Sequence, residues 1–78
     1  MSEFSDFCNM LREKSGMTIY YIAKVSDMER TALNRMLNGK RLPRYEDVER
    51  FCGTIRANEK EKEHIRELYI MEKMGKKP

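Results

Sequence analysis

Residues 18–43 contain the pattern that most restricts how this chain can fold. Apolar residues recur there in two consecutive runs, each at the three- and four-residue spacing of a buried helical face. Thr18 is a good cap for a first helix, and Asn38-Gly39 is a strong pair for ending a second one. We therefore predict two short helices joined by a tight turn, over about residues 19–25 and 29–37. Their predicted buried residues are Ile22, Ala23, Val25, Met28, Leu33, Met36 and Leu37.

The side chains left outside on the second helix are long or form hydrogen bonds, and such side chains can read base edges in a DNA major groove. An arginine can bind guanine through two donors, an asparagine can pair with adenine, and a threonine methyl can contact thymine. We expect Arg30 to contribute most, followed by Arg35 and then Asn34. The alternative for Arg35 is a salt bridge to a carboxylate of the following helix. The full predicted base-reading set is Arg30, Thr31, Asn34, Arg35 and Glu29.

Charge is sorted along the chain in a way that agrees with this prediction. The net charge of +3 is only mildly basic, yet cations cluster in residues 30–44 while carboxylates concentrate in residues 46–49 and 59–67. A cationic cluster favours a polyanionic partner, because binding releases counterions from a nucleic acid. Glu29 is the exception: its carboxylate either accepts a hydrogen bond from a cytosine amino group or stays solvated at the helix start. The clustered cations are Arg30, Arg35, Lys40, Arg41 and Arg44.

The order of these motifs resembles that of lambda-repressor-like helix-turn-helix domains of the Xre/Cro type. The resemblance covers roughly residues 4–56, and it implies a compact all-α fold of five helices in which residues 18–38 form the motif. It also implies sequence-specific binding to double-stranded DNA, with the helix of about residues 29–37 in the major groove. The matching residues are Thr18, Ile22, Ala23, Met28, Leu33, Met36, Asn38, Gly39, Lys40, Arg41 and Pro43.

Two positions depart from the usual residues of this family. Ile19 stands where glutamine usually contacts the DNA backbone or an outer base, so another residue must supply that contact. Asp27 stands at the turn position usually held by glycine, and aspartate tolerates the left-handed backbone region. The chain after the recognition helix meets the sugar-phosphate backbone in this family, and the preceding helix can add neutral contacts. The predicted backbone contacts are Thr18, Tyr20, Asn38, Lys40, Arg41 and Arg44.

We expect residues 1–78 to form a single domain in which further helices surround the motif. One helix is predicted from about Asp6 to Ser15, with Ser5 or Asp6 as its cap and Phe4 just before the cap. Gly16 ends this helix. Another helix is predicted over about Tyr45–Cys52, with Gly53 as its stop.

A last helix, over about residues 59–74, carries more apolar residues than one buried stripe requires. It begins with a capping box of Asn58 and Glu61, and Gly75 with the Lys76-Lys77 tail ends it. Two roles remain open for it: cover for the core of the other helices, or an interface for a homodimer or a following domain. We expect Ile65, Leu68 and Met71 to face the core, and Tyr69, Ile70 and Met74 to lie partly outside.

The cysteine and histidine content argues against catalysis and metal binding. Cys8 and Cys52 lie far apart in the sequence on apolar helical faces, so we interpret both as core residues rather than as a disulfide or redox pair. His64 is the single histidine and cannot complete a zinc site. With no catalytic constellation, we predict no enzymatic activity, no cofactor and no metal. Without a signal peptide or membrane span in the sequence, we expect a cytoplasmic protein with no membrane partner.

The function that these features favour is sequence-specific transcriptional regulation in a bacterium, a phage or a mobile element. We expect such a regulator to bind double-stranded DNA as a homodimer, with the helix of about residues 59–74 as a candidate interface. The alternative is a helix-turn-helix scaffold for protein–protein contacts, of an antitoxin-like or adaptor kind, with weak or no DNA binding. Ile19 and Glu29 keep this alternative open, because neither side chain is well suited to a DNA contact at its position.

Overall fold

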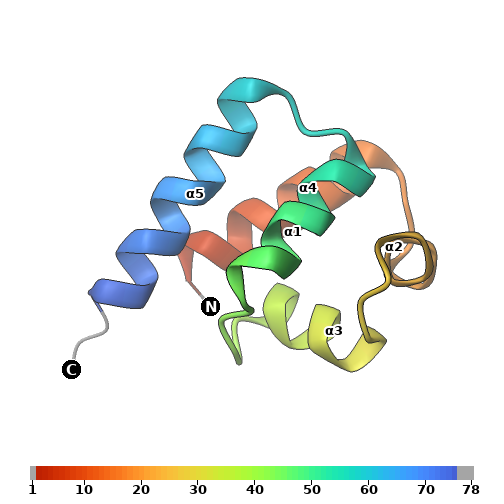
Figure 1. Cartoon of the computed structure of the whole chain (residues 1–78), viewed down its shortest axis with the longest axis horizontal. Coiled ribbons are helices and arrows are strands. Elements are labelled where there is room, and N and C mark those ends of the chain that lie inside the picture. The colour runs from red at the N-terminus through yellow and green to blue at the C-terminus, as the bar shows by residue number, and fades with distance from the viewer. Residues whose placement is uncertain (1, 76–78) are drawn as a thin grey trace.

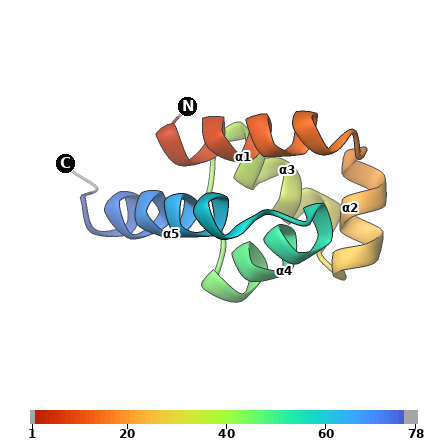
Figure 2. The ribbon, with the colours of Figure 1, turned by 90° about the horizontal axis from the view of Figure 1, so that it is seen from above.

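Five α-helices and no strand make up residues 2–75, the part of the chain that the computed structural model describes. Helix α1 contacts α3, α4 and α5, while α2 packs against α3 and α4. Figures 1 and 2 show α2 and α5 at opposite ends of the molecule, with α1 running between them. The fold is all-α, as predicted; Lys76 and Lys77 lie outside the described residues. The helices are α1 (Glu3–Ser15), α2 (Ile19–Ser26), α3 (Arg30–Asn38), α4 (Tyr45–Ile55) and α5 (Glu59–Met74).

Helix α1 begins earlier than predicted, because Ser2 and Ser5 form a capping box. The Ser2 hydroxyl accepts a hydrogen bond from Ser5 N at 3.1 Å, and the Ser5 hydroxyl accepts one from Ser2 N at 3.0 Å. The prediction that Ser5 or Asp6 caps this helix is therefore wrong. Serine here takes the place of the glutamate or glutamine that usually completes a capping box, so the sequence did not indicate a cap at Ser2. Phe4 consequently lies inside the first turn, buried in the core.

Helix α4 continues through Gly53, which was predicted to stop it, and ends at Ile55. The next residue, Arg56, adopts the left-handed conformation with a φ of 59° and closes the helix. The extra residues bury Ile55 in the core. Burying an aliphatic side chain contributes about 1.5–3 kcal/mol, which offsets the cost of up to about 1 kcal/mol for a glycine inside a helix.

The turn between α2 and α3 has the predicted geometry. Asp27 adopts the left-handed conformation, with φ of 63° and ψ of 32°, and its N–H donates to Ala23 O. Met28 N donates to the same carbonyl at 3.1 Å. Ala23 is buried, in agreement with the need for a small residue where helices approach closely. Aspartate therefore serves in place of the usual turn glycine.

One face of each helix contributes to the core, whose largest fully buried side chains include Phe51 and Ile22. Cys8 and Cys52 are buried free thiols, as expected for core residues. Burial raises the pKa of the Cys8 thiol well above its usual value and that of Cys52 to about 11. Both thiols therefore stay protonated near neutral pH, where a protonated thiol is a poor nucleophile.

For three apolar side chains, the observed exposure is the reverse of the predicted one. Val25 is 53% exposed rather than buried, because α2 turns Ser26 inward and the Ser26 hydroxyl donates to Ile22 O at 2.6 Å. On α5, Met71 is 62% exposed and Tyr69 only 5% exposed, the reverse of the prediction. Burial of Tyr69 is favourable because its hydroxyl donates to a backbone carbonyl at 2.8 Å, so no polar atom is left unsatisfied.

Candidate nucleic-acid interface

The outer face of α3 is the centre of the candidate interface. The helix buries one apolar stripe, which consists of Leu33, Met36 and Leu37. Because residues three and four positions apart share a helical face, the polar side chains that alternate with this stripe are turned toward solvent. Of the predicted base-reading residues on α3, those that are exposed are Arg30, Thr31 and Arg35, and Asn34 is partly exposed.

Glu29 lies at the N-terminal end of this face. Helix α3 is shifted by one residue from its predicted range of 29–37, because Glu29 has the extended backbone of an N-cap residue, with φ of −71° and ψ of 139°. The Glu29 side chain makes no capping hydrogen bond and is exposed. Its negative charge is favourable beside the positive end of the helix dipole. The carboxylate is thus available to a ligand, next to Arg30.

The C-terminal end of α3 fixes the start of the basic loop. Gly39 adopts a φ of 74°, and the N–H groups of Lys40 and Arg41 both donate to Arg35 O, at 3.0 and 3.3 Å. Asn9 of α1 donates from Nδ2 to Leu37 O at 2.6 Å. These bonds satisfy carbonyls that a helix end would otherwise leave unpaired, and they set the direction in which the loop leaves the helix.

Tyr69 of α5 fixes the other end of the same loop. Its hydroxyl donates to Pro43 O at 2.8 Å, and its ring lies edge-on against Phe4 and Tyr45, with centroid distances of 5.8 and 5.6 Å. Tyr45 makes this edge contact with Tyr69 and remains 41% exposed. The loop is anchored at both ends by helices outside the helix-turn-helix motif. The exposed predicted backbone contacts that follow or end α3 are Asn38, Lys40, Arg41 and Arg44.

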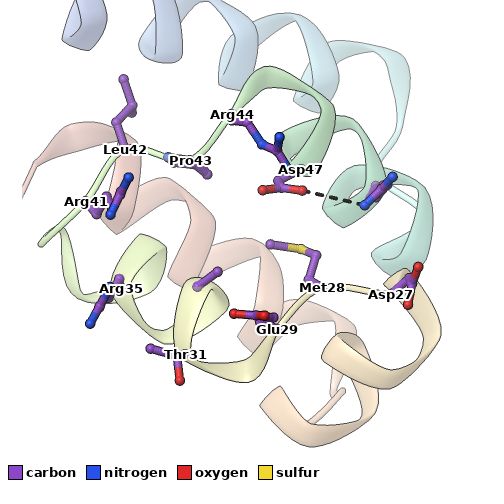
Figure 3. A pocket seen from close by; sticks show the side chains of 12 residues that line it. Asp27, Met28, Glu29, Thr31, Arg35, Arg41, Leu42, Pro43, Arg44 and Asp47 are labelled. Atoms are coloured by element: carbon purple, nitrogen blue, oxygen red, sulfur yellow. Dashed lines mark ion pairs between the residues drawn. The ribbon is translucent and has the colours of Figure 1, made fainter.

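A groove of about 560 Å³ lies between α3 and the segment formed by the loop and the start of α4. Figure 3 shows its mixed lining, with Glu29 and Arg35 from the α3 side and Asp47 from α4. Asp47 pairs with Arg50 on its own helix at 3.7 Å. None of the ion pairs within residues 2–75 includes Arg35, so the alternative role considered for Arg35, a salt bridge to the following helix, is not formed.

The N-terminal part of α2 lies beside α3 and offers neutral contacts. Thr18 caps α2 by accepting a hydrogen bond from Tyr21 N at 3.0 Å. A hydroxyl that accepts in this way still has a proton to donate, for example to a phosphate oxygen. Ile19 packs against the core, so the residue in place of the family's usual glutamine serves the fold. Tyr20 is 60% exposed, and its ring centroid lies 5.8 Å from Arg30 Cζ.

Two residues that hold the interface in place were not found from the sequence. Asn9 donates a hydrogen bond to the carbonyl of Leu37, 28 positions away, so no local sequence pattern predicts this contact. Tyr69 belongs to an apolar stripe whose orientation was predicted wrongly. The surplus of apolar residues on α5 was interpreted as core cover or an interface, so it did not indicate that Tyr69 anchors the loop.

Two other kinds of site, a metal centre and a membrane span, are absent from residues 2–75. Within residues 2–75, no three His, Cys, Asp or Glu side chains are grouped so that they could bind a metal ion. No helix in this range has the length and apolar character needed to cross a membrane. The exposed polar and cationic surface of α3 and residues 38–44 is thus the candidate site that the described residues offer.

A family model described as a helix-turn-helix domain matches residues 3–65. The match spans α1 to α4 and the first part of α5, and it includes every predicted DNA-contact residue. No curated protein and no solved structure matches the chain significantly. The family match and the five-helix arrangement confirm the resemblance inferred from the sequence. The chain therefore belongs to the helix-turn-helix domain family and has a lambda-repressor-like fold.

Proposed function

We propose that this chain is a sequence-specific DNA-binding transcriptional regulator of bacterial, phage or mobile-element type. Membership of a helix-turn-helix family supports DNA binding by a regulator at the coarse level. The observation that carries the finer proposal is the continuous exposed surface of α3 and the doubly anchored loop that follows it. A rigid helix with polar side chains outside and a cationic segment at its end fits a major groove flanked by phosphates.

In this proposal, different residues read the bases and bind the DNA backbone. Side chains on the outer face of α3 read base edges, and Glu29 accepts from a cytosine amino group. Cations of the loop neutralise phosphates, which positions the protein without selecting a sequence. The base-reading residues are Arg30, Thr31, Asn34, Arg35 and Glu29. The backbone contacts are Thr18, Tyr20, Asn38, Lys40, Arg41 and Arg44.

The replacement Arg30→Ala tests the assignment of the leading base-reading residue. Arg30 is exposed and belongs to none of the ion pairs within residues 2–75, so we expect the free energy of unfolding to change by no more than about 1 kcal/mol, the upper end for the exposed contact with the Tyr20 ring. The affinity for the preferred duplex should fall roughly 5- to 150-fold, because a bidentate contact with guanine discriminates by about 1–3 kcal/mol. The preferred duplex is obtained by selecting bound sequences from a random pool.

A matched control for this test is Lys60→Ala, which removes an exposed cation at the start of α5, away from α3 in Figure 1. We expect Lys60→Ala to leave the affinity for the selected duplex nearly unchanged. A loss of thermal stability in Arg30→Ala with unchanged DNA affinity would refute the base-reading assignment.

We propose further that the protein binds DNA as a homodimer through α5. Three exposed apolar residues of α5 form a patch that shares no residue with the candidate interface: Ile70, Met71 and Met74. A groove of about 450 Å³ between α1 and α5 lies beside it and is lined in part by Met10 and Phe7. Dimers of helix-turn-helix domains commonly place their two-fold axis on that of a palindromic operator, and this favours a second copy of the chain as the occupant.

The double variant Met71→Lys/Met74→Lys is expected to dissociate this dimer. Because burying a methionine side chain contributes about 1.5–3 kcal/mol, the dissociation constant should rise at least about tenfold. Sedimentation equilibrium of the parent and the variant measures this change. Val25→Lys, which places a lysine on exposed apolar surface of α2, is the matched control and should dimerise like the parent. A parent chain that sediments as a monomer at all concentrations would exclude the α5 dimer.

The second candidate function is a helix-turn-helix scaffold for protein–protein contacts, of an antitoxin-like or adaptor kind. The exposed apolar patch of α5 and the negative charge of Glu29 in the base-reading set favour it. If the selection enriches no sequence and the chain binds DNA only weakly, this candidate replaces DNA-binding regulation. An enriched palindrome supports regulation by a dimer.

A further inference from the structure

Arg30 and Tyr20 form a contact that joins the recognition helix to the helix before it. The guanidinium carbon of Arg30 lies 5.8 Å from the centroid of the Tyr20 ring. This distance is within the range of about 6 Å over which a cation is attracted by the face of an aromatic ring. Within residues 2–75, the side chain of Arg30 takes part in no ion pair. Among the described residues, the Tyr20 ring is therefore the group over which this guanidinium lies.

We propose that Tyr20 is a positioning residue, which holds the Arg30 guanidinium in the orientation that reads its base pair. This inference rests on the proposed function, because it assigns a new role within DNA recognition. It differs from the proposed contact of Tyr20 with the DNA backbone, which needs only the hydroxyl group. The positioning role needs the aromatic ring.

The stack and the base contact can exist together, because they use different parts of the guanidinium. A guanidinium that stacks flat on an aromatic ring keeps its N–H donors pointing outward in its own plane. A guanine presents its O6 and N7 acceptors to two such in-plane donors. Tyr20 can thus remain in contact with Arg30 while Arg30 binds a base edge.

The position of Arg30 explains why restraint would matter there. Arg30 is the first residue of α3, where the helix dipole is positive and disfavours a cation. Glu29 is adjacent but forms no ion pair with it. A long arginine side chain in such a place would otherwise sample many rotamers, and a group that is already ordered loses less entropy on binding.

Tyr21 provides an internal comparison on the same helix. It is adjacent to Tyr20 and also exposed, but no cation lies over its ring among the described residues. Replacing either tyrosine removes a similar area of exposed aromatic surface. Replacement of Tyr20 by leucine removes the ring that contacts Arg30, whereas replacement of Tyr21 by leucine leaves that contact intact.

The experiment compares the parent chain with Y20F, Y20L and Y21L on two duplexes. One is the selected duplex, and the other carries a substitution at the base pair whose preference is lost in Arg30→Ala. The measured quantity is the ratio of the two affinities. We expect Y20L to lower this ratio about two- to fivefold, the effect of an exposed cation–π contact, and Y20F and Y21L to retain it. In the Arg30→Ala background, Y20L should not change the ratio.

Three results would overturn the inference. If the parent selects a sequence but Y20L keeps the parent ratio, positioning by Tyr20 is excluded and the proposed function stands. If Y20F and Y20L weaken binding to both duplexes equally, Tyr20 acts only through its hydroxyl on a phosphate. If the parent selects no sequence, the proposed function fails and the inference fails with it. Circular dichroism of each variant checks that the exposed substitutions leave the fold intact.

Discussion

Replacing Tyr69 by alanine is expected to lower the free energy of unfolding by about 3–5 kcal/mol, the cost typical of removing a large buried aromatic ring. The ring is 5% exposed and lies edge-on against Phe4 and Tyr45. Since small domains are stabilised by only about 5–15 kcal/mol, a loss of this size should shift urea unfolding to much lower denaturant concentrations. Far-ultraviolet circular dichroism follows this transition directly.

The variant Tyr69→Phe separates the ring from the hydroxyl. It keeps the packing but removes the donor to Pro43 O, so we expect a loss of about 1 kcal/mol. It should also weaken DNA binding, because the loop that carries the proposed phosphate contacts loses one anchor. The matched control is Tyr21→Ala, which removes an exposed tyrosine and should cost no more than about 0.5 kcal/mol. Equal losses in Tyr69→Ala and Tyr21→Ala would contradict the packing described for α5.

The affinity for the selected duplex is expected to fall about a thousandfold between roughly 50 and 200 mM salt when two copies bind. Each copy carries three exposed loop cations: Lys40, Arg41 and Arg44. Each neutralised phosphate contributes about −0.9 to the slope of log affinity against log salt, which gives a slope of about −5 for a dimer. A single bound copy would give a slope of about −2.7 and a loss of only about fortyfold. Fluorescence anisotropy at several salt concentrations measures the slope.

Single substitutions identify which cations produce this salt dependence. Lys40→Ala should weaken binding to all sequences alike and make the slope shallower by about one per copy. Lys60→Ala serves again as the control and should leave the slope unchanged. A slope near zero for the parent chain would argue against phosphate binding by the loop and would favour the protein-contact scaffold.

Helix ends were predictable where a common capping pattern sets them, whereas the serine–serine capping box of α1 was missed. Asn58 and Glu61 form the expected capping box, and Thr18 caps α2, because both interactions link residues three positions apart. Gly53 was misjudged because the burial of Ile55, a tertiary effect, overrides the local preference of glycine. The turn at Asp27 was predictable because the family resemblance implies a left-handed residue at this position, and aspartate tolerates that conformation.

Parts of the candidate site depended on contacts that a sequence pattern does not reveal. The exposed residues of α3 follow from its apolar stripe, so their orientation was accessible from periodicity. The orientation of α5 was not, because the choice between Tyr69 and Met71 as the buried residue depends on a carbonyl acceptor 26 positions before Tyr69.

Both loop anchors are made to main-chain carbonyls, at Leu37 and at Pro43. A carbonyl is present whatever side chain a position carries, so neither anchor depends on the residue types within the loop. Substitutions at Lys40 or Arg41 can therefore alter the charge that the loop presents without changing the path of its backbone. For protein engineering, this makes α1 and α5 a fixed frame, on which the proposed base-reading residues of α3 and the charge of the loop can be changed independently.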